Sequence, residues 1–266
     1  MKNDYSMKTK QNWQYDSDLI PFDSSKTMNL TTILFYLSIL NLLVIVAAPL
    51  SRVYFDAPGF LTFRIMLIAI VIGMLFGIVI LIQSTILFIS KSPVIWHLAL
   101  CVIFLGFIPP VISIIIIGIN GISKPLIHDI TTDINDPPEY VEVKNLRQAG
   151  DNTVEYITEE NATKQKTAYP DISPIMTTLS FDDALIEATQ TVKDLQWEFS
   201  NIDYETGIIE AYESSNLFGF VDDIVIRVRQ DGAGSRIDIR SSSRVGKGDL
   251  GKNAERISTF IKTFKS

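Results

Sequence analysis

Three long runs of apolar residues dominate the first half of the chain. They cover about residues 30–50, 65–89 and 94–119, and none of them contains Asp, Glu, Lys or Arg. Each is close to the roughly 20 residues with which a helix crosses the hydrocarbon layer of a bilayer. A buried helix of a soluble protein would instead have an apolar stripe and a polar face. The pattern therefore predicts a transmembrane region of three helices over residues 28–119.

The last third of the chain has amphipathic periodicity. Apolar residues recur at helical spacing from Phe181 to Leu195, with two acids in the first turn. A second amphipathic helix is expected near the C-terminus, over about residues 254–264. Between the helices lie four short β-rich segments separated by turn residues, at residues 196–202, 207–213, 223–229 and 235–242. This order predicts an α+β domain, with a four-stranded antiparallel sheet and both helices on one face.

Charge is distributed unevenly between the two halves. The 266 residues have a formal net charge of −7, but residues 1–119 hold 7 basic and 5 acidic residues, whereas residues 120–266 hold 16 and 25. This division argues against a single soluble globule, a basic nucleic-acid-binding protein and a disordered chain, and one cysteine argues against a disulfide scaffold. The predicted organisation is a polar tail (1–27), the transmembrane region (28–119), a tether with a polar loop (120–168) and a soluble domain (169–266).

Basic residues near the predicted spans indicate an orientation. The first span is expected to be uncleaved, because the segment before it is long and mixes acids with lysines, unlike a signal peptide. With three spans, the N-terminus and the loop at residues 90–93 share one side, and the C-terminal domain lies on the other. The first side carries more lysines, which favours a cytoplasmic N-terminus. The soluble domain is then periplasmic or exoplasmic, and a bacterial inner membrane is the expected location.

Few residues within the spans point to a function. Gly73 and Gly77 form a GxxxG pair that would allow another helix to approach closely, either from the same chain, which we favour, or from a second copy. Pro109 and Pro110 are expected to kink the third helix. His97 is the only ionisable candidate for an ion pathway, and it lies near a helix end, so a transporter or pump is disfavoured.

The tether mixes apolar positions with turn formers. Residues 125–138 are expected to lie as an irregular clasp on the domain, and residues 144–166 to form a mobile polar loop. Asn161 begins a glycosylation sequon by pattern alone. The acids of the clasp and His128 have neither EF-hand nor zinc spacing, and acids beside Thr, Asn and Pro usually cap turns. No metal or cofactor is predicted.

Arginines alternate with apolar residues in the last two predicted strands. Ile224, Ile226 and Val228 point to one face, so Arg227 and Arg229 point to the other. The next strand places Arg236, Asp238 and Arg240 on that same, uncovered face. Two interpretations remain open: a solvated face whose arginines pair with acids of neighbouring strands, or a platform for phosphate or carboxylate groups.

Two loops of the domain could contact a partner. The loop Phe218-Gly219-Phe220 is either a plug folded back on the core near Trp197, which we favour, or an exposed wedge. Residues 246–251 fit GxGxxG, but no parallel strand follows, so a dinucleotide-binding unit is not complete. A turn into the last helix is expected instead, with weak anion capture there; Arg244 and Lys247 add positive charge.

The C-terminal half resembles a known family. The runs IEAYESSNLFGFVDDIVIRVR and GSRIDIRSSSRVGKGDLGKNAERISTF, with PLIHDITTDINDPPEY upstream, are similar to the bacterial and plastid domain of unknown function 1499. The resemblance covers about residues 125–266 and implies no chemistry, because that family has no established activity. The residues expected to recur in it are Trp197, Phe218, Gly219, Phe220, Asp222, Asp223, Arg227, Arg229, Asp238, Arg240, Ser243, Arg244, Gly246, Gly251, Asn253 and Arg256.

Three classes of function follow. The first choice is a multi-pass membrane protein whose domain is a binding or assembly module for an anionic lipid, glycan or protein partner. An enzyme acting on an envelope component is second, but Asp222 and Asp223 are adjacent on a strand and face opposite sides, so they would not share a site. A purely structural membrane subunit is third.

Overall fold

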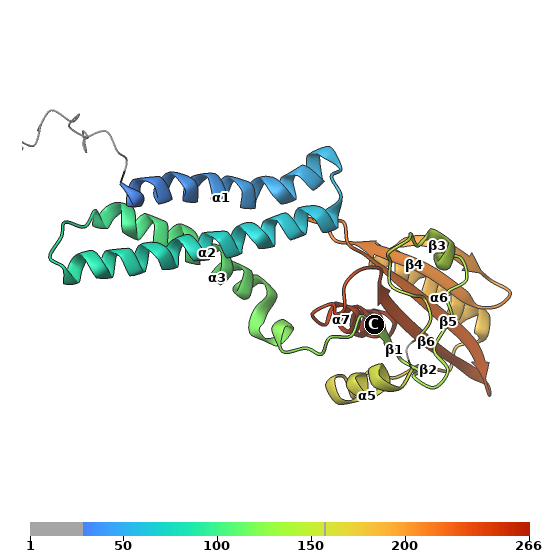
Figure 1. The fold of residues 1–266 in the computed structure, drawn as a ribbon. Coiled ribbons are helices and arrows are strands. Elements are labelled where there is room, and N and C mark those ends of the chain that lie inside the picture. Colours follow the sequence, from blue (N-terminus) through green and yellow to red (C-terminus); the bar gives the residue numbers. More distant parts are fainter. Residues whose placement is uncertain (1–28, 157) are drawn as a thin grey trace, which may run out of the picture.

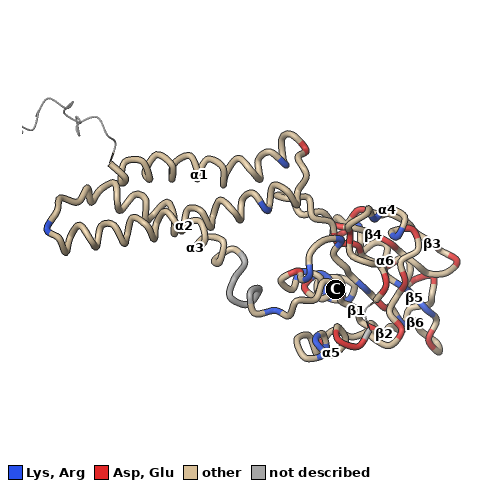
Figure 2. Tube along the Cα trace, viewed as in Figure 1, with Lys and Arg blue, Asp and Glu red and all other residues tan. Residues whose placement is uncertain are grey.

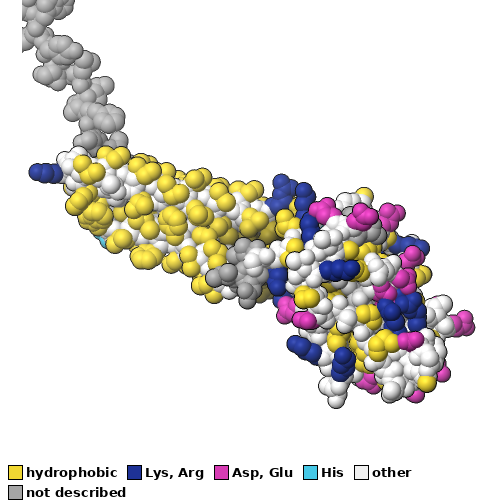
Figure 3. All heavy atoms as spheres, turned by 90° about the horizontal axis from the view of Figure 1, so that it is seen from below, with side chains coloured by type: hydrophobic (Ala, Val, Ile, Leu, Met, Phe, Trp, Pro, Cys, Tyr) yellow, Lys and Arg dark blue, Asp and Glu magenta, His cyan; other side chains and the backbone are white. Residues whose placement is uncertain are grey.

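Three apolar helices and an α+β domain make up the computed structural model, which describes residues 29–156 and 158–266 (Figure 1). The helices are α1 (Leu30–Phe55), α2 (Gly59–Ile89) and α3 (Trp96–Ile122), each long and apolar enough to span a membrane. Figure 3 shows their surface covered by hydrophobic side chains. The three predicted spans are therefore confirmed as apolar helices. The polar tail predicted over residues 1–27 lies outside the described residues.

Small residues let α2 and α3 pack closely. A Cβ atom added to Gly106 would lie 2.4 Å from the carbonyl oxygen of Gly73, and one added to Gly77 would lie 2.7 Å from the ring of Phe107. The Asn41 side chain of α1 donates a hydrogen bond of 2.9 Å to the Ala69 carbonyl of α2. The GxxxG pair is thus used within the chain, which is the alternative favoured from the sequence: α3 packs against both glycines, and self-association through them is not supported.

The domain is built on a six-stranded antiparallel sheet with the order β1-β6-β5-β4-β3, and β2 also pairs with β6. The strands are β1 (Asp129–Thr131), β2 (Ile175–Thr177), β3 (Glu198–Asp203), β4 (Ile208–Ser214), β5 (Val221–Asp231) and β6 (Gly234–Ser243). The helices are α4 (Val143–Leu146), α5 (Thr158–Ala168), α6 (Phe181–Asp194) and α7 (Lys252–Phe264). The central four strands and the flanking helices match the prediction.

The predicted count of four strands is wrong, because β1 and β2 add to the sheet. Both pair with the outer edge of β6, β1 near its end at Ser242 and β2 near its start at Ser235. Each strand has only three residues, too few for an alternating pattern to show. The side-chain amide of Gln165 then bonds both the N–H and the carbonyl of Thr131, as a further strand would.

Helices α6 and α7 cover one face of the sheet, as predicted. Ile224, Ile226 and Val228 of β5 are fully buried against apolar residues of both helices. Trp197 stacks on Phe260 of α7, with ring centroids 5.9 Å apart. Helix α6 begins at the predicted place because the Ser180 side chain accepts the N–H of Asp183.

The opposite face of the sheet is also covered, which corrects the prediction that it is open. Residues 132–156 of the tether lie on it, with Tyr140 and Val143 packed on Val225 in a second apolar cluster. The stretch expected as a mobile loop, residues 144–166, contains the end of α4 and most of α5. The clasp prediction for residues 125–138 agrees with this position on the domain.

Candidate functional site

The predicted arginine ladder exists on the tether-covered face. Arg227 of β5 lies opposite Asp238 of β6, and Arg229 lies opposite Arg236. The Asp238 carboxylate is fully buried and accepts hydrogen bonds from Arg227 at 3.1 Å, Arg229 at 2.7 Å and Arg236 at 3.0 Å. One carboxylate cannot neutralise three guanidinium groups, so this arrangement requires further acids.

The tether supplies those acids. Asp136 pairs with Arg227 at 3.0 Å and with Arg229 at 2.8 Å, and Asp133 pairs with Arg236. A hydrogen bond from Arg229, opposed in part by burial, lowers the pKa of the Asp136 carboxyl, and the charge of Arg227 lowers it further. These three arginines and three acids, Asp238 included, form a balanced lattice that joins the tether to the sheet.

Arg240 is buried and completely paired. Its guanidinium makes a bidentate pair with Asp129 at 3.0 and 2.7 Å and donates to the carbonyls of Pro138 and Val154. The rings of Tyr140 and Tyr156 lie 4.8 and 5.5 Å from it, on the tether. With 2% of its surface exposed, Arg240 cannot bind an anion from solvent. Its prediction as an anion ligand is wrong.

Burial also raises the pKa of the two neighbouring tyrosines. It raises the pKa of Tyr140 well above its usual value, and it raises the pKa of Tyr156 to about 12, with the charge of Asp129 adding to both shifts. The Tyr140 hydroxyl donates to the backbone carbonyl of Asp223 at 3.0 Å, whereas the buried Tyr156 hydroxyl has no hydrogen-bond partner in the structure.

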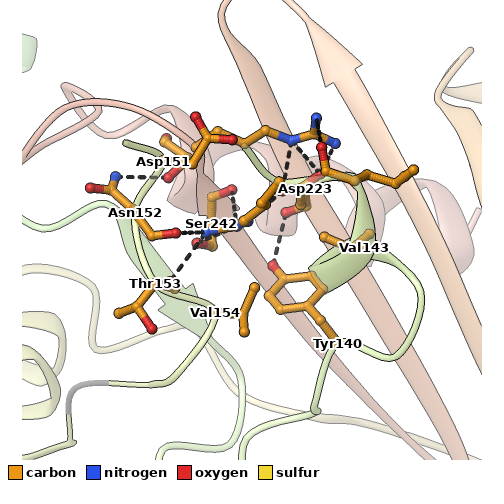
Figure 4. Close-up of polar contacts among 12 residues, drawn as sticks. Tyr140, Val143, Asp151, Asn152, Thr153, Val154, Asp223 and Ser242 are labelled. Atoms are coloured by element: carbon orange, nitrogen blue, oxygen red, sulfur yellow. Dashed lines mark hydrogen bonds and ion pairs between the residues drawn. The ribbon is translucent and has the colours of Figure 1, made fainter. Parts of the chain in front are cut away.

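A third ion pair closes the other end of this face (Figure 4). The Asp223 carboxylate is fully buried and accepts from Arg147 at 3.0 Å and from Arg244 at 2.7 Å. Arg147 also donates to the carbonyls of Asn152 and Thr153, which holds the tether in a tight turn. The Arg244 guanidinium is therefore used in an ion pair within the domain. Arg147 was missed because it lies at the start of the segment expected to be mobile.

Glu210 is a second residue that the sequence did not single out. It is fully buried on β4, and its carboxylate accepts the backbone N–H groups of Val141 at 2.7 Å and Glu142 at 2.8 Å. These bonds satisfy the N–H groups at the start of α4. An acid between the apolar residues Ile209 and Ala211 was the available signal, because a buried carboxylate requires donors.

The remaining family residues tie α7 to the sheet. Arg256 pairs with Asp222 at 2.8 Å, on the face opposite to the Asp223 pairs, as the alternation of a strand requires. Asn253 is fully buried and accepts the hydroxyl of Ser241 while donating to Ser243 and to the carbonyl of His128. These contacts assign a structural role to the recurrent side chains.

The β6–α7 loop, residues 244–251, does not offer an open anion site at the helix start. The Asp249 carboxylate accepts the N–H groups of Gly251 at 2.9 Å and Asn253 at 2.6 Å, so the predicted anion capture there is wrong. Gly246 and Gly251 have φ values of 91° and 89°, which favour glycine. Lys247 is exposed and makes no ion pair with any described residue.

The Phe218-Gly219-Phe220 loop docks on the transmembrane helices. The rings of Phe218 and Phe220 stack at 5.7 Å, and both lie edge-on to Phe63 of α2, at 5.1 and 5.5 Å. The predicted plug against Trp197 is wrong, because that ring stacks within the core on α7 instead. Gly219 has a φ of 64°, and a Cβ there would lie 2.7 Å from the Arg52 guanidinium of α1.

A family model described as "Protein of unknown function (DUF1499)" matches residues 129–264, from the start of β1 to the end of α7. No curated protein matches the chain. Within the described residues, no group of three or more His, Cys, Asp or Glu side chains could hold a metal ion.

Proposed function

The chain belongs to the DUF1499 family of proteins of unknown function, and we propose that it is a membrane-anchored binding module of the cell envelope. In this proposal the three helices hold the α+β domain on one membrane surface. The domain binds an acidic envelope component on its membrane-proximal side. The module is non-catalytic.

The docking of the domain on its own helices carries the proposal. Phe218 and Phe220 pack on Phe63, and a Cβ atom at Gly59 would lie 1.7 Å from the Phe218 carbonyl oxygen. A domain on a loose tether would not need such close contact with α2. The contact directs one side of the domain to the bilayer, where Figure 3 shows basic side chains between the apolar helices and the domain.

The partner is expected to be acidic, because the basic side chains that can still bind an external anion lie on the membrane-proximal side of the domain. Arg64 and Lys247 are exposed, and Lys124 is partly exposed. The arginine lattice on the other sheet face is neutralised by the tether, so it does not offer free guanidinium groups of this kind. Figure 2 shows acids and bases mixed over that distant part of the domain.

Binding is favoured over catalysis because the buried carboxylates of the domain are already engaged in ion pairs and hydrogen bonds. Asp223 and Asp238 are buried in arginine pairs, and the Glu210 carboxylate accepts backbone amides. A general acid or base needs a carboxyl that can exchange a proton with a substrate. Paired carboxylates of this kind are instead suited to holding a rigid fold.

The proposed location is the bacterial inner membrane, with the domain exported. The lysines of the N-terminal tail and Lys91 outnumber the basic residues that flank the spans on the domain side, and this supports the orientation. The domain contains no cysteine, since Cys101 lies in α3, and this is compatible with an oxidising compartment.

A thermal-shift screen of the detergent-purified full chain tests the proposal. The probes are phosphatidylglycerol, phosphatidylcholine and a uronic-acid oligosaccharide, each added to the same protein. We expect an acidic probe to raise the melting temperature and phosphatidylcholine to have no effect, because a ligand stabilises the state it binds. Equal shifts with all probes, or no shift with either acidic probe, would contradict the proposal.

A further inference from the structure

Two segments far apart in the sequence meet beside the end of α3. A Cβ atom at Gly248 would lie 3.0 Å from Leu126, and one at Gly251 would lie 3.2 Å from the Lys124 side chain. The β6–α7 loop therefore lies against residues 124–126 of the tether. Lys124 and Leu126 of the tether therefore lie beside the loop that carries Lys247 and Leu250.

The leucines of this pair of segments are unusually exposed. Leu126 has 70% of its surface exposed and Leu250 has 48%, although both lie in the folded domain. Leu250 also has a φ of 57°, a left-handed conformation that a non-glycine residue adopts at a cost. A strained backbone that holds an apolar side chain in water suggests that the side chain has a partner outside the chain.

The position of the patch identifies that partner. Lys124 follows the end of α3 at Ile122 by two residues, so it lies where the chain leaves the apolar span. Figure 1 shows the turn between β6 and α7 on the side of the domain nearer the helices. The aromatic contact of Phe218 with Phe63 fixes that side toward the membrane. Headgroup phosphates and upper acyl chains are therefore the nearest external groups.

We infer that Lys124, Leu126, Lys247 and Leu250 form a binding site for an anionic phospholipid headgroup, an inference that rests on the proposed function. The two ammonium groups pair with the oxygens of the headgroup phosphate, and the two leucines enter the boundary between headgroups and acyl chains. The Asp249 carboxylate within the loop does not compete, because it accepts the backbone N–H groups of Gly251, just before α7, and of Asn253 in its first turn.

Native mass spectrometry of the full chain with titrated lipid tests the site. We expect the wild-type protein to prefer phosphatidylglycerol to phosphatidylcholine, and Lys124→Gln with Lys247→Gln to weaken phosphatidylglycerol binding roughly tenfold or more. The matched control is Lys144→Gln with Lys193→Gln, the same change of charge at exposed positions of α4 and α6, which should keep the preference.

A second variant separates binding from folding. Leu250→Gly removes the exposed side chain and also relieves the left-handed backbone, so we expect a higher melting temperature together with weaker lipid binding. If the two-lysine variant keeps its preference, the site is wrong while the proposed function stands. If only the acidic oligosaccharide binds the wild type, lipid is the wrong partner, and if neither acidic probe binds, the proposed function fails as well.

Discussion

Asp129 and Arg240 form a bidentate ion pair whose two side chains are almost completely buried. The guanidinium donates two hydrogen bonds of 3.0 and 2.7 Å, and the side chains are 3% and 2% exposed. Asp129 begins β1 in the tether, and Arg240 lies in the second half of β6, where β1 pairs with it. The pair therefore makes the tether an integral layer of the domain.

Replacing Arg240 by Gln should destabilise the protein strongly. The change leaves the Asp129 carboxylate buried without its cation, and breaking a buried pair in this way costs about 3–5 kcal/mol. Urea unfolding of the full chain in detergent, followed by tryptophan fluorescence, measures the free energy of unfolding. Arg229→Gln is the control, because that side chain is 39% exposed and should cost only about 1 kcal/mol. Equal, small losses for both variants would contradict the structural role of Arg240.

The sequence predicted the sheet well wherever its pattern was local. Alternation in β5 and β6 identified both the core face and the arginine face correctly. The cover on the arginine face was not predicted, because Asp136 lies 91 residues from Arg227 in the chain and neither residue indicates the other. Local pattern gives the chemistry of each segment, but ion pairs over such separations depend on the tertiary fold.

The anion-platform interpretation failed for the same physical reason. Arg227, Arg229 and Arg236 are a basic group only if the tether is ignored, because Asp133 and Asp136 restore the balance. Acids beside turn formers were correctly read as turn residues, since the Asp133 carboxylate also accepts the N–H groups of Asn135 and Asp136. The sequence pattern did not indicate that Asp133 and Asp136 also form ion pairs with the arginines of the sheet.

Tyr156 should make the protein sensitive to alkaline pH. Burial raises the pKa of its hydroxyl from 10 to about 12 in the folded state, so between these values the unfolded chain loses this proton and the folded chain keeps it. The stabilising contribution is therefore complete below about pH 10 and is lost as the pH rises toward 12. Melting temperatures measured from pH 8 to 11 should fall less steeply for Tyr156→Phe than for the wild type.

The two tyrosine variants, Tyr156→Phe and Tyr140→Phe, should differ in stability at neutral pH. The Tyr156 hydroxyl has no hydrogen-bond partner in the structure, so its removal costs little at neutral pH. Tyr140→Phe loses the hydrogen bond to the Asp223 carbonyl and should be less stable at neutral pH, by about 1 kcal/mol. A Tyr156→Phe variant with the wild-type pH profile would show that this residue does not cause the alkaline loss.

Phe63 and Phe218 should be energetically coupled. Their rings meet edge-on at 5.1 Å across the junction of the helices and the domain, and such pairs contribute about 0.5–1.5 kcal/mol beyond area burial. A double-mutant cycle of Phe63→Ala and Phe218→Ala in the full chain should give a coupling energy in that range. Phe88, at the other end of α2, provides the control cycle with Phe218 and should give none. Zero coupling for Phe63 would remove the basis for a docked domain.

The orientation of the chain can be tested with fusions to the full-length protein. The basic residues near the spans favour an exported domain, so a reporter that is active only outside the cytoplasm should be active when fused at Ser266. A cytosol-active reporter at Ser266 should be silent and should be active at the N-terminus instead. Adding three arginines after Asp56, on the domain side of α1 and α2, should weaken or reverse this pattern. Activity of the cytosolic reporter at Ser266 of the wild type would refute the proposed location.

Gly106→Ala should loosen the helical bundle without changing the oligomeric state. The added methyl group would lie 2.4 Å from the Gly73 carbonyl oxygen, so α2 and α3 must separate, at a cost of about 1–3 kcal/mol. Ala47→Val is the control, because Ala47 is exposed on α1 and its added carbon atoms would face lipid. Thermal melts in detergent should show a loss for the first variant only, and sedimentation should give the wild-type mass for both. If Gly106→Ala instead lowered the mass while the melting temperature stayed unchanged, the glycine face would serve a second copy, and the packing of α3 on α2 would not be its main use.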